Sequence, residues 1–391
     1  MSVRSVFRWG ITSIFFLSSI FLIVGIGYSD ILPVTEYNGQ DDGQTETNLM
    51  KVKHLETPVN LKAVYMTSYV AGDKPLRTSV KKLADETEIN SIVIDIKDYT
   101  GHIAFDVSVD LLKKFNSAIP RIPDIKDFLK ELHDKDIYTI GRIAVFQDPL
   151  VAGKRKDLAV LSKTTGNVWK DYKGLSWIDP GAREYWEYIL ALALESYQIG
   201  FDEINFDYIR FPSDGNMKDI SYPHSKDTKK TEVMKNFFSF MRDGLKDSGV
   251  VMSADLFGMT MTNTDDLNIG QSLESAIPYF DYISPMVYPS HYPTGFIGIK
   301  NPASKPYEVV RYSLDKASDR SSTTPQKIRP WLQDFNLGAT YDAKKIRKQI
   351  QATYDAGFDS WMLWNAKSVY TRDALLPFWK EEDSQADTGQ I

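Results

Sequence analysis

The feature that most constrains the fold is a regular alternation of short apolar, strand-like segments with longer, helix-like segments. Such alternation predicts parallel strands connected by helices. Eight such units fit a (β/α)8 TIM barrel. The alternative, an open doubly wound sheet, usually carries a glycine-rich phosphate loop, and the sequence has none. The expected strands are Leu61–Met66, Ser91–Lys97, Tyr138–Phe146, Glu203–Ile209, Val250–Phe257, Tyr282–Tyr288, Ile328–Gln333 and Ser360–Trp364.

Helices are expected in most of the connections between these strands. Asp179 followed by Pro180 predicts a helix start, because aspartate favours the N-cap and proline the first helical position. Gly200, Gly249 and Gly357 predict helix ends. The expected helices are Thr78–Glu88, Pro123–Lys135, Pro180–Gln198, Thr231–Asp247, Pro306–Ala317 and Asp342–Ala356.

The N-terminus has the pattern of a membrane signal. Arg4 and Arg8 precede an apolar run over residues 9–28, which is long enough to span a bilayer. We expect a signal anchor, or a signal peptide if it is cleaved, with the remainder outside the cytoplasm in either case. The domains that follow from this are 1–28 (signal segment), 29–58 (flexible polar linker), 59–380 (the barrel) and 381–391 (disordered acidic tail).

Composition excludes several classes of function. A net charge of -6 argues against a nucleic-acid partner. The chain has no cysteine, and its 5 histidines are not spaced as metal ligands, so we expect no metal or cofactor. The aromatic content of 13% suits stacking on sugar rings as well as a large core. The sequence does not indicate an oligomeric state.

The segment from Gly200 to Pro212 predicts a strand that leads to a reaction site. Glu203, Asn205 and Asp207 alternate with apolar residues, so they share one face of the strand. A polar inner row is typical of a barrel strand below a site. Asp207 and Arg210 then lie near the carboxyl end of the strand. The alternative is a structural ion pair or a strand-end turn.

A second aspartate, Asp255, ends the next strand-like segment. Neighbouring strands lie about 4.8 Å apart, so the carboxylates of Asp207 and Asp255 are expected within several ångströms of each other. Glycoside hydrolysis needs such a pair, one as proton donor and one as nucleophile or base. The alternative is that one of them caps a helix or pairs with Arg142, Lys97 or Arg210.

Further candidates lie near other predicted strand ends. Asp95 and Lys97 share a strand face and could form a polar floor beside Asp207, or a scaffold ion pair. Tyr288 and His291 lie in a proline-rich segment that could line a sugar cleft or form a rigid loop. The tryptophans near the last two strand ends could stack on sugars or belong to the core. The predicted substrate-binding residues are Asp95, Lys97, Arg142, Arg210, Tyr288, His291, Trp331, Gln333 and Trp364.

Several of these segments together resemble a bacterial family of glycoside-hydrolase domains that carries a domain-of-unknown-function label. That family is described as an α-amylase-like (β/α)8 barrel. The resemblance spans residues 60 to 380, and its longest motif runs from Gly200 to Gly215. The other matching segments are 94–101, 141–149, 253–258, 284–292, 329–333 and 357–365.

The resemblance implies a glycosidase fold in which Asp207 has the position of an α-amylase-type nucleophile. The chain departs from the α-amylase pattern at Asp255, where those enzymes have a glutamate acid, and at Gln333, where an aspartate is usual. We therefore expect a hydrolase of an extracellular or cell-envelope polysaccharide that works by carboxylate acid/base chemistry. The alternative is a non-catalytic, membrane-tethered glycan-binding barrel.

Overall fold

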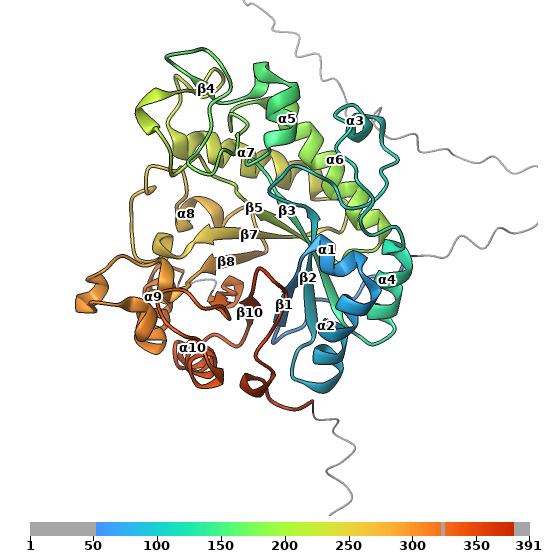
Figure 1. Cartoon of the computed structure of the whole chain (residues 1–391), viewed down its shortest axis with the longest axis vertical. Coiled ribbons are helices and arrows are strands. Elements are labelled where there is room, and N and C mark those ends of the chain that lie inside the picture. The colour runs from blue at the N-terminus through green and yellow to red at the C-terminus, as the bar shows by residue number, and fades with distance from the viewer. Residues whose placement is uncertain (1–51, 322–324, 379–391) are drawn as a thin grey trace, which may run out of the picture. The chain divides into compact units, whose positions relative to one another are not determined.

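The computed structural model describes residues 52–321 and 325–378, which form a closed barrel of eight parallel strands surrounded by helices (Figure 1). This architecture confirms the predicted (β/α)8 TIM barrel. The barrel order is β1-β10-β9-β8-β7-β5-β3-β2. The strands are β1 (Lys62–Met66), β2 (Ser91–Lys97), β3 (Tyr138–Ala144), β5 (Glu203–Asp207), β7 (Val251–Phe257), β8 (Tyr282–Met286), β9 (Trp331–Gln333) and β10 (Trp361–Trp364).

Two short strands outside the barrel, β4 (Leu161–Ser162) and β6 (Ile220–Ser221), pair antiparallel. They lie in the long loops that follow β3 and β5. In Figure 1 the helices surround the strands, with α6 and α7 beside β3 and β5 and with α9 and α10 on the orange-red side. The helices are α1 (Ser68–Gly72), α2 (Lys74–Glu86), α3 (Asp110–Lys113), α4 (Ile125–His133), α5 (Pro149–Lys154), α6 (Arg183–Ile199), α7 (Lys230–Leu245), α8 (Leu273–Ala276), α9 (Pro306–Arg320) and α10 (Ala343–Asp355).

Two predicted helix starts are wrong. Helix α2 begins at Lys74 rather than at Thr78, because Asp73 accepts the N–H of Leu76 and caps it there. Helix α6 begins at Arg183 rather than at Pro180. The Asp179 carboxylate does not cap it, because it accepts the backbone N–H groups of Gly181, His224 and Ser225 instead. Asp179 therefore ties the loop after β3 to the loop after β5. The predicted ends at Gly200 and Gly357 are supported by positive φ angles of 125° and 87°. The end predicted at Gly249 is wrong, because α7 already ends at Leu245.

The barrel separates two buried apolar layers. The larger layer lies between strands and helices and includes Ile204 and Phe206 of β5. A smaller cluster gathers residues of β1, β2, β3, β9 and β10 with Tyr288. The side chains of Glu203, Asn205 and Asp207 alternate with the apolar ones and contact residues of other barrel strands. The predicted polar inner row of β5 is therefore confirmed.

The predicted signal segment, most of the predicted linker and the acidic tail lie outside the described residues. None of the helices within 52–321 and 325–378 is long and apolar enough to cross a membrane.

Candidate active site

One arginine, Arg142 of β3, contacts three aspartates from three other strands. Its Nη1 donates to Asp95 Oδ1 of β2 at 2.6 Å, and its Nη2 donates to Asp207 Oδ2 of β5. Its Nε lies 3.8 Å from Asp255 Oδ2 of β7. All four side chains are buried. These residues are called the Arg142 cluster below. The cluster contains three carboxyl groups and only one cation.

Strand pairing explains why the cluster forms. Asp95 lies opposite Arg142 in the β2–β3 register, and Arg142 lies opposite Asn205 in the β3–β5 register. Strand β5 pairs in turn with β7, so Asp207 and Asp255 end neighbouring strands, as predicted. The sequence alternative in which an aspartate pairs with Arg142 is also observed. Because one guanidinium serves three acids, that pairing does not neutralise all of them.

Asp255 is the member whose charged form is least favoured. Burial and the neighbouring Asp207 raise the pKa of the Asp255 carboxyl well above its usual range, and Arg142 opposes this rise. Asp255 Oδ1 accepts hydrogen bonds from Asn205 Nδ2 at 2.9 Å and Trp331 Nε1 at 2.8 Å. Both donors use Oδ1, so a proton on Asp255 would be carried by Oδ2.

Asp207 accepts hydrogen bonds through both of its carboxylate oxygens. Besides Arg142, its Oδ1 accepts the backbone N–H of Tyr208 at 2.6 Å. Tyr208 has a φ of 53°, an unusual value for a residue with a side chain, and it turns the chain out of β5 directly after Asp207. The turn aims a backbone donor at the carboxylate. Asp207 therefore accepts hydrogen bonds from a guanidinium and from a backbone N–H.

Tyr65 of β1 completes the cluster on the side of Asp95. Its hydroxyl donates to Asp95 Oδ2, and burial raises the pKa of both groups. The Tyr65 ring stacks on Trp364 at 3.9 Å between centroids, and the Arg142 guanidinium lies 5.0 Å from the Trp364 ring. Tyr65 was not predicted. Its only signal in the sequence is a polar-tipped residue near the end of an apolar strand.

The structure does not bring Lys97 to the cluster. The β2–β3 register shifts between Asp95 and Lys97, so the two do not form the predicted polar floor. Lys97 is completely buried and pairs with Asp148 at 2.9 Å, and the Tyr185 hydroxyl donates to the same aspartate at 2.7 Å. Lys97 therefore belongs to a scaffold ion pair, with Asp148 and not with Asp95 as its partner.

Trp331 and Gln333 are also placed differently from the prediction. Trp331 is completely buried and donates to Asp255, so the prediction that it stacks on a sugar is wrong. Gln333 is completely buried too, and its Oε1 accepts the Ser290 N–H at 3.1 Å. Both residues therefore support the site from within the barrel wall. Strand β9 has only three residues, so its sequence is too short for the alternation to show which side chains face inward.

Tyr288, His291 and Trp364 come together around a cavity of about 620 Å³ at the carboxyl ends of β8, β9 and β10. Asp334 lies in the same wall, and both of its oxygens accept hydrogen bonds from Thr371. Burial and the charges of Asp255 and Asp207 raise the pKa of Tyr288. Trp364 lines the cavity and lies 5.0 Å from the Arg142 guanidinium, so the cavity adjoins the Arg142 cluster.

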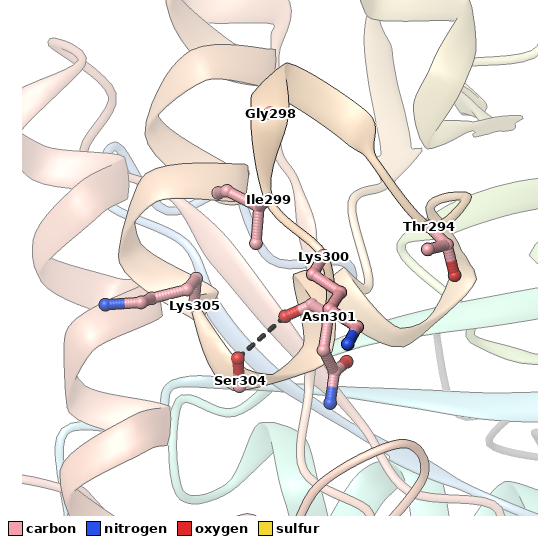
Figure 2. Close-up of a pocket in the computed structure, with 7 residues that line it drawn as sticks. All are labelled: Thr294, Gly298, Ile299, Lys300, Asn301, Ser304 and Lys305. Carbon is pink, nitrogen blue, oxygen red and sulfur yellow. Dashed lines mark hydrogen bonds between the residues drawn. The ribbon is translucent and has the colours of Figure 1, made fainter.

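A second cavity of about 640 Å³ lies in the long segment between β8 and α9 (Figure 2). Its lining includes the side chains of Lys300 and Lys305, and the Ser304 hydroxyl donates to the Asn301 carbonyl at 2.7 Å. The lining contains no carboxylate. This cavity lacks the groups that acid/base chemistry needs. Across residues 52–321 and 325–378, no cluster of acidic or histidine side chains is arranged to hold a metal ion.

The comparisons with known proteins agree with this geometry. Residues 63–370 match the model of a family described as "Putative glycosyl hydrolase domain". The chain belongs to this family. The match confirms the family predicted from the sequence motifs and supports a glycosidase. No curated protein matches the chain.

Solved structures share the fold of this glycosyl hydrolase domain. The glycoside hydrolase domain of PgaB (BpsB) from Bordetella bronchiseptica is 12% identical, with a TM-score of 0.57 over 80% of this chain and 95% of that one. The α-L-fucosidase isoenzyme 2 of Paenibacillus thiaminolyticus is 13% identical, with a TM-score of 0.53 over 81% and 48%. A hypothetical protein from Ruminiclostridium thermocellum is 32% identical, with a TM-score of 0.45 over 53% and 98%.

Proposed function

We propose that this protein hydrolyses glycosidic bonds of an extracellular or cell-envelope polysaccharide, with Asp255 as general acid and Asp207 as nucleophile. The observation that carries the proposal is the contrast between these two aspartates. Burial and a neighbouring carboxylate raise the pKa of Asp255, whereas Asp207 is bound by Arg142 and a backbone N–H. Two carboxyl groups with opposed environments are the basis of glycosidase acid/base assignment.

In the first step, Asp255 Oδ2 gives its proton to the glycosidic oxygen, and an oxygen of Asp207 attacks the anomeric carbon as the leaving group departs with the bonding electrons. In the second step, the Asp255 carboxylate removes a proton from water, and this water displaces Asp207 from the sugar. Both carboxyl groups lie within ion-pair distance of one guanidinium. The proposed double displacement retains the configuration of the anomeric carbon.

Arg142 has a part in both steps. Its Nε is buried and has no hydrogen-bond partner, and it lies 3.8 Å from Asp255 Oδ2. When Asp255 gives up its proton, this Nε–H is the nearest free donor for the new negative charge. At the same moment Asp207 loses its charge to the sugar. Arg142 can therefore stabilise whichever of the two aspartates is charged.

The substrate class rests on the family, on the cavity and on the N-terminal sequence. The Bordetella neighbour is named for glycoside hydrolysis and the Paenibacillus neighbour for removing fucose, and both share the barrel. Trp364 and Tyr288 supply aromatic surface beside the carboxylates. The apolar run over residues 9–28 supports a place outside the cytoplasm, tethered to the membrane or secreted after cleavage.

The test is release of reducing ends from a panel of bacterial envelope glycans and α-glucans by wild type and by Asp207→Asn. The account expects release from at least one polymer by wild type, and its loss in the variant with an unchanged melting temperature. Glycan binding by both proteins without release would replace the hydrolase by a tethered glycan-binding barrel.

A further inference from the structure

Arg210 carries a buried positive charge that the proposed reaction does not use. Its side chain lies just beyond β5 and is only 8% exposed. Arg142 and Arg329, the other two arginines buried in the barrel wall, each pair with carboxylates. Arg210 forms no ion pair with any residue in the described ranges. A buried guanidinium without an anion is costly, so its retention points to a partner that arrives with a ligand.

The guanidinium of Arg210 is held in a cage of aromatic rings. Its central carbon lies 4.6 Å from the Phe257 ring, 4.7 Å from the Trp177 ring and 5.4 Å from the Tyr208 ring. These rings come from the end of β7, the loop after β3 and the turn after β5. Cation–π contacts with several rings stabilise the charge and fix the plane of the guanidinium before any ligand binds.

Only one edge of this guanidinium is occupied. Nη1 donates to the Phe211 carbonyl at 2.9 Å and to the Ser213 hydroxyl at 3.2 Å. Nε and Nη2 donate to no residue of the described part of the chain. Unlike Arg142 Nε, they are not among the polar atoms sealed from solvent. The free edge is the one that binds a carboxylate or another oxyanion through two parallel hydrogen bonds.

The position of Arg210 connects it to the Arg142 cluster. The Tyr208 ring lies 5.4 Å from the Arg210 guanidinium and 6.0 Å from that of Arg142. Tyr208 directly follows Asp207, and Phe257 lies two residues after Asp255. Burial lowers the pKa of Arg210, while Tyr208 and the more distant carboxylates of Asp207, Asp214 and Asp171, none of them in an ion pair with it, oppose this. Arg210 and the Arg142 cluster therefore share the Tyr208 ring as a neighbour, on the side of β5 and β7.

We propose that Arg210 binds an oxyanion on the substrate, a carboxylate, sulfate or phosphate group on a sugar next to the cleaved bond. The inference rests on the proposed function and narrows its substrate class to acidic glycans. The aromatic rings lower the local polarity around the guanidinium, so an ion pair that forms there is stronger than one in bulk water. A neutral sugar would leave the free edge of Arg210 without a partner.

The test is calorimetric titration of wild type, Arg210→Met, Arg210→Lys and Lys173→Met with D-glucuronate, inorganic sulfate and neutral D-glucose. Lys173 is a matched control, because it is an exposed cation whose charge helps lower the pKa of His291 at the cavity. Saturable glucuronate or sulfate binding should weaken about tenfold or more in Arg210→Met, as expected for a hydrogen bond to a charged group, and less in Arg210→Lys. Lys173→Met should stay within about twofold of wild type.

Two results would overturn the inference: anion binding that is equally strong in Arg210→Met, or no saturable binding of either anion by wild type at tens of millimolar. Arg210→Met also removes the ring contacts and hydrogen bonds of Arg210, so a somewhat lower melting temperature is expected, and binding is measured well below it. Binding is measured without turnover, so the two proposals can fail separately. Arg210-dependent binding with no hydrolysis of any glycan contradicts only the proposed function. Hydrolysis without anion binding contradicts only the inference.

Discussion

Strand β5 carries two acidic side chains on its inner face, and their surroundings differ sharply. At its start, Glu203 pairs with Arg329 at 2.9 Å and accepts a hydrogen bond from Tyr138 at 3.2 Å. At its end, Asp207 shares Arg142 with two other aspartates. Both networks are buried. The first has one acid for one base, whereas the second has three acids for one base.

The comparison distinguishes a network that supports the fold from a network that can transfer a proton. In a one-to-one pair each charge has a partner. A surplus of carboxylates disfavours the charged form of some of them, and the pKa values of Asp255 and Asp95 are raised accordingly. Stability does not require such a surplus, but proton transfer does. The predictions below test this difference, from the largest expected effect to the smallest.

Asp255→Asn should separate activity from stability. We expect kcat to fall by about 10²–10⁴, the usual contribution of a general acid. The raised pKa means that the folded state binds the proton more tightly than the unfolded state, so wild type loses stability as the pH rises through the folded pKa. The variant should therefore be at least as stable as wild type at alkaline pH, and this advantage should shrink on acidification. Urea unfolding at several pH values measures this. A variant that is less stable throughout would make Asp255 a scaffold residue.

Glu203→Gln should have the opposite effect. It leaves Arg329 buried without a counter-charge, which costs about 3–5 kcal/mol of the free energy of unfolding. The rate per folded molecule should remain close to that of wild type, because the pair lies at the other end of β5 from Asp207. Denaturant unfolding measures the free energy of unfolding, and steady-state kinetics measure the rate per folded molecule. Lost activity with unchanged stability would erase the distinction between the networks.

Trp331→Phe should move the pH profile. The indole N–H stabilises the charged form of Asp255, so its removal should raise the pKa of that acid further. A general acid works while protonated, so kcat/KM falls as the pH rises through its pKa. The alkaline limb of the profile should therefore move to higher pH. Trp361→Phe is the control, because Trp361 donates to Tyr354 outside the site. The same shift in both variants would contradict the role of Trp331.

Trp364→Phe should have the smallest effect. Trp364 lines the cavity beside the Arg142 cluster. Its indole ring has an N–H group that a phenylalanine ring lacks. A loss of about 1 kcal/mol of sugar stacking corresponds to an increase in KM of about fivefold, with kcat nearly unchanged. Steady-state kinetics on the glycan that wild type hydrolyses would measure this. A fall in kcat alone would assign Trp364 to the support of Arg142 instead.

Much of the fold could be predicted because it depends on patterns along the chain. Each predicted barrel strand overlaps an observed one, and the alternation in β5 correctly assigned Glu203, Asn205 and Asp207 to one face. Parallel order then brought Asp207 and Asp255 to neighbouring strand ends. These steps require only periodicity and the geometry of a closed sheet.

The remainder depends on contacts that a pattern does not contain. The register shift after Asp95 separates Lys97 from its expected neighbour, and a single bulge of this kind leaves no mark on hydrophobic alternation. Trp331 was predicted to bind substrate because tryptophan occurs both in sugar-stacking surfaces and in protein cores, and the sequence does not distinguish the two. The helix signal at Asp179 was misleading, because its carboxylate binds a loop that is distant in sequence. The hydrogen-bond and ion-pair partners of polar side chains, which a sequence pattern does not show, determine where such residues lie.

The most direct test of the central claim compares two substrates, an aryl glycoside with a good leaving group and the natural glycan, for Asp207→Asn and Asp255→Asn. A good leaving group needs little help from a general acid, whereas both substrates need the nucleophile. We predict that Asp207→Asn loses hydrolysis of both substrates and that Asp255→Asn loses the glycan but keeps much of the aryl glycoside cleavage. Wild-type rates for either variant on the natural glycan would contradict the claim that the Arg142 cluster performs the reaction.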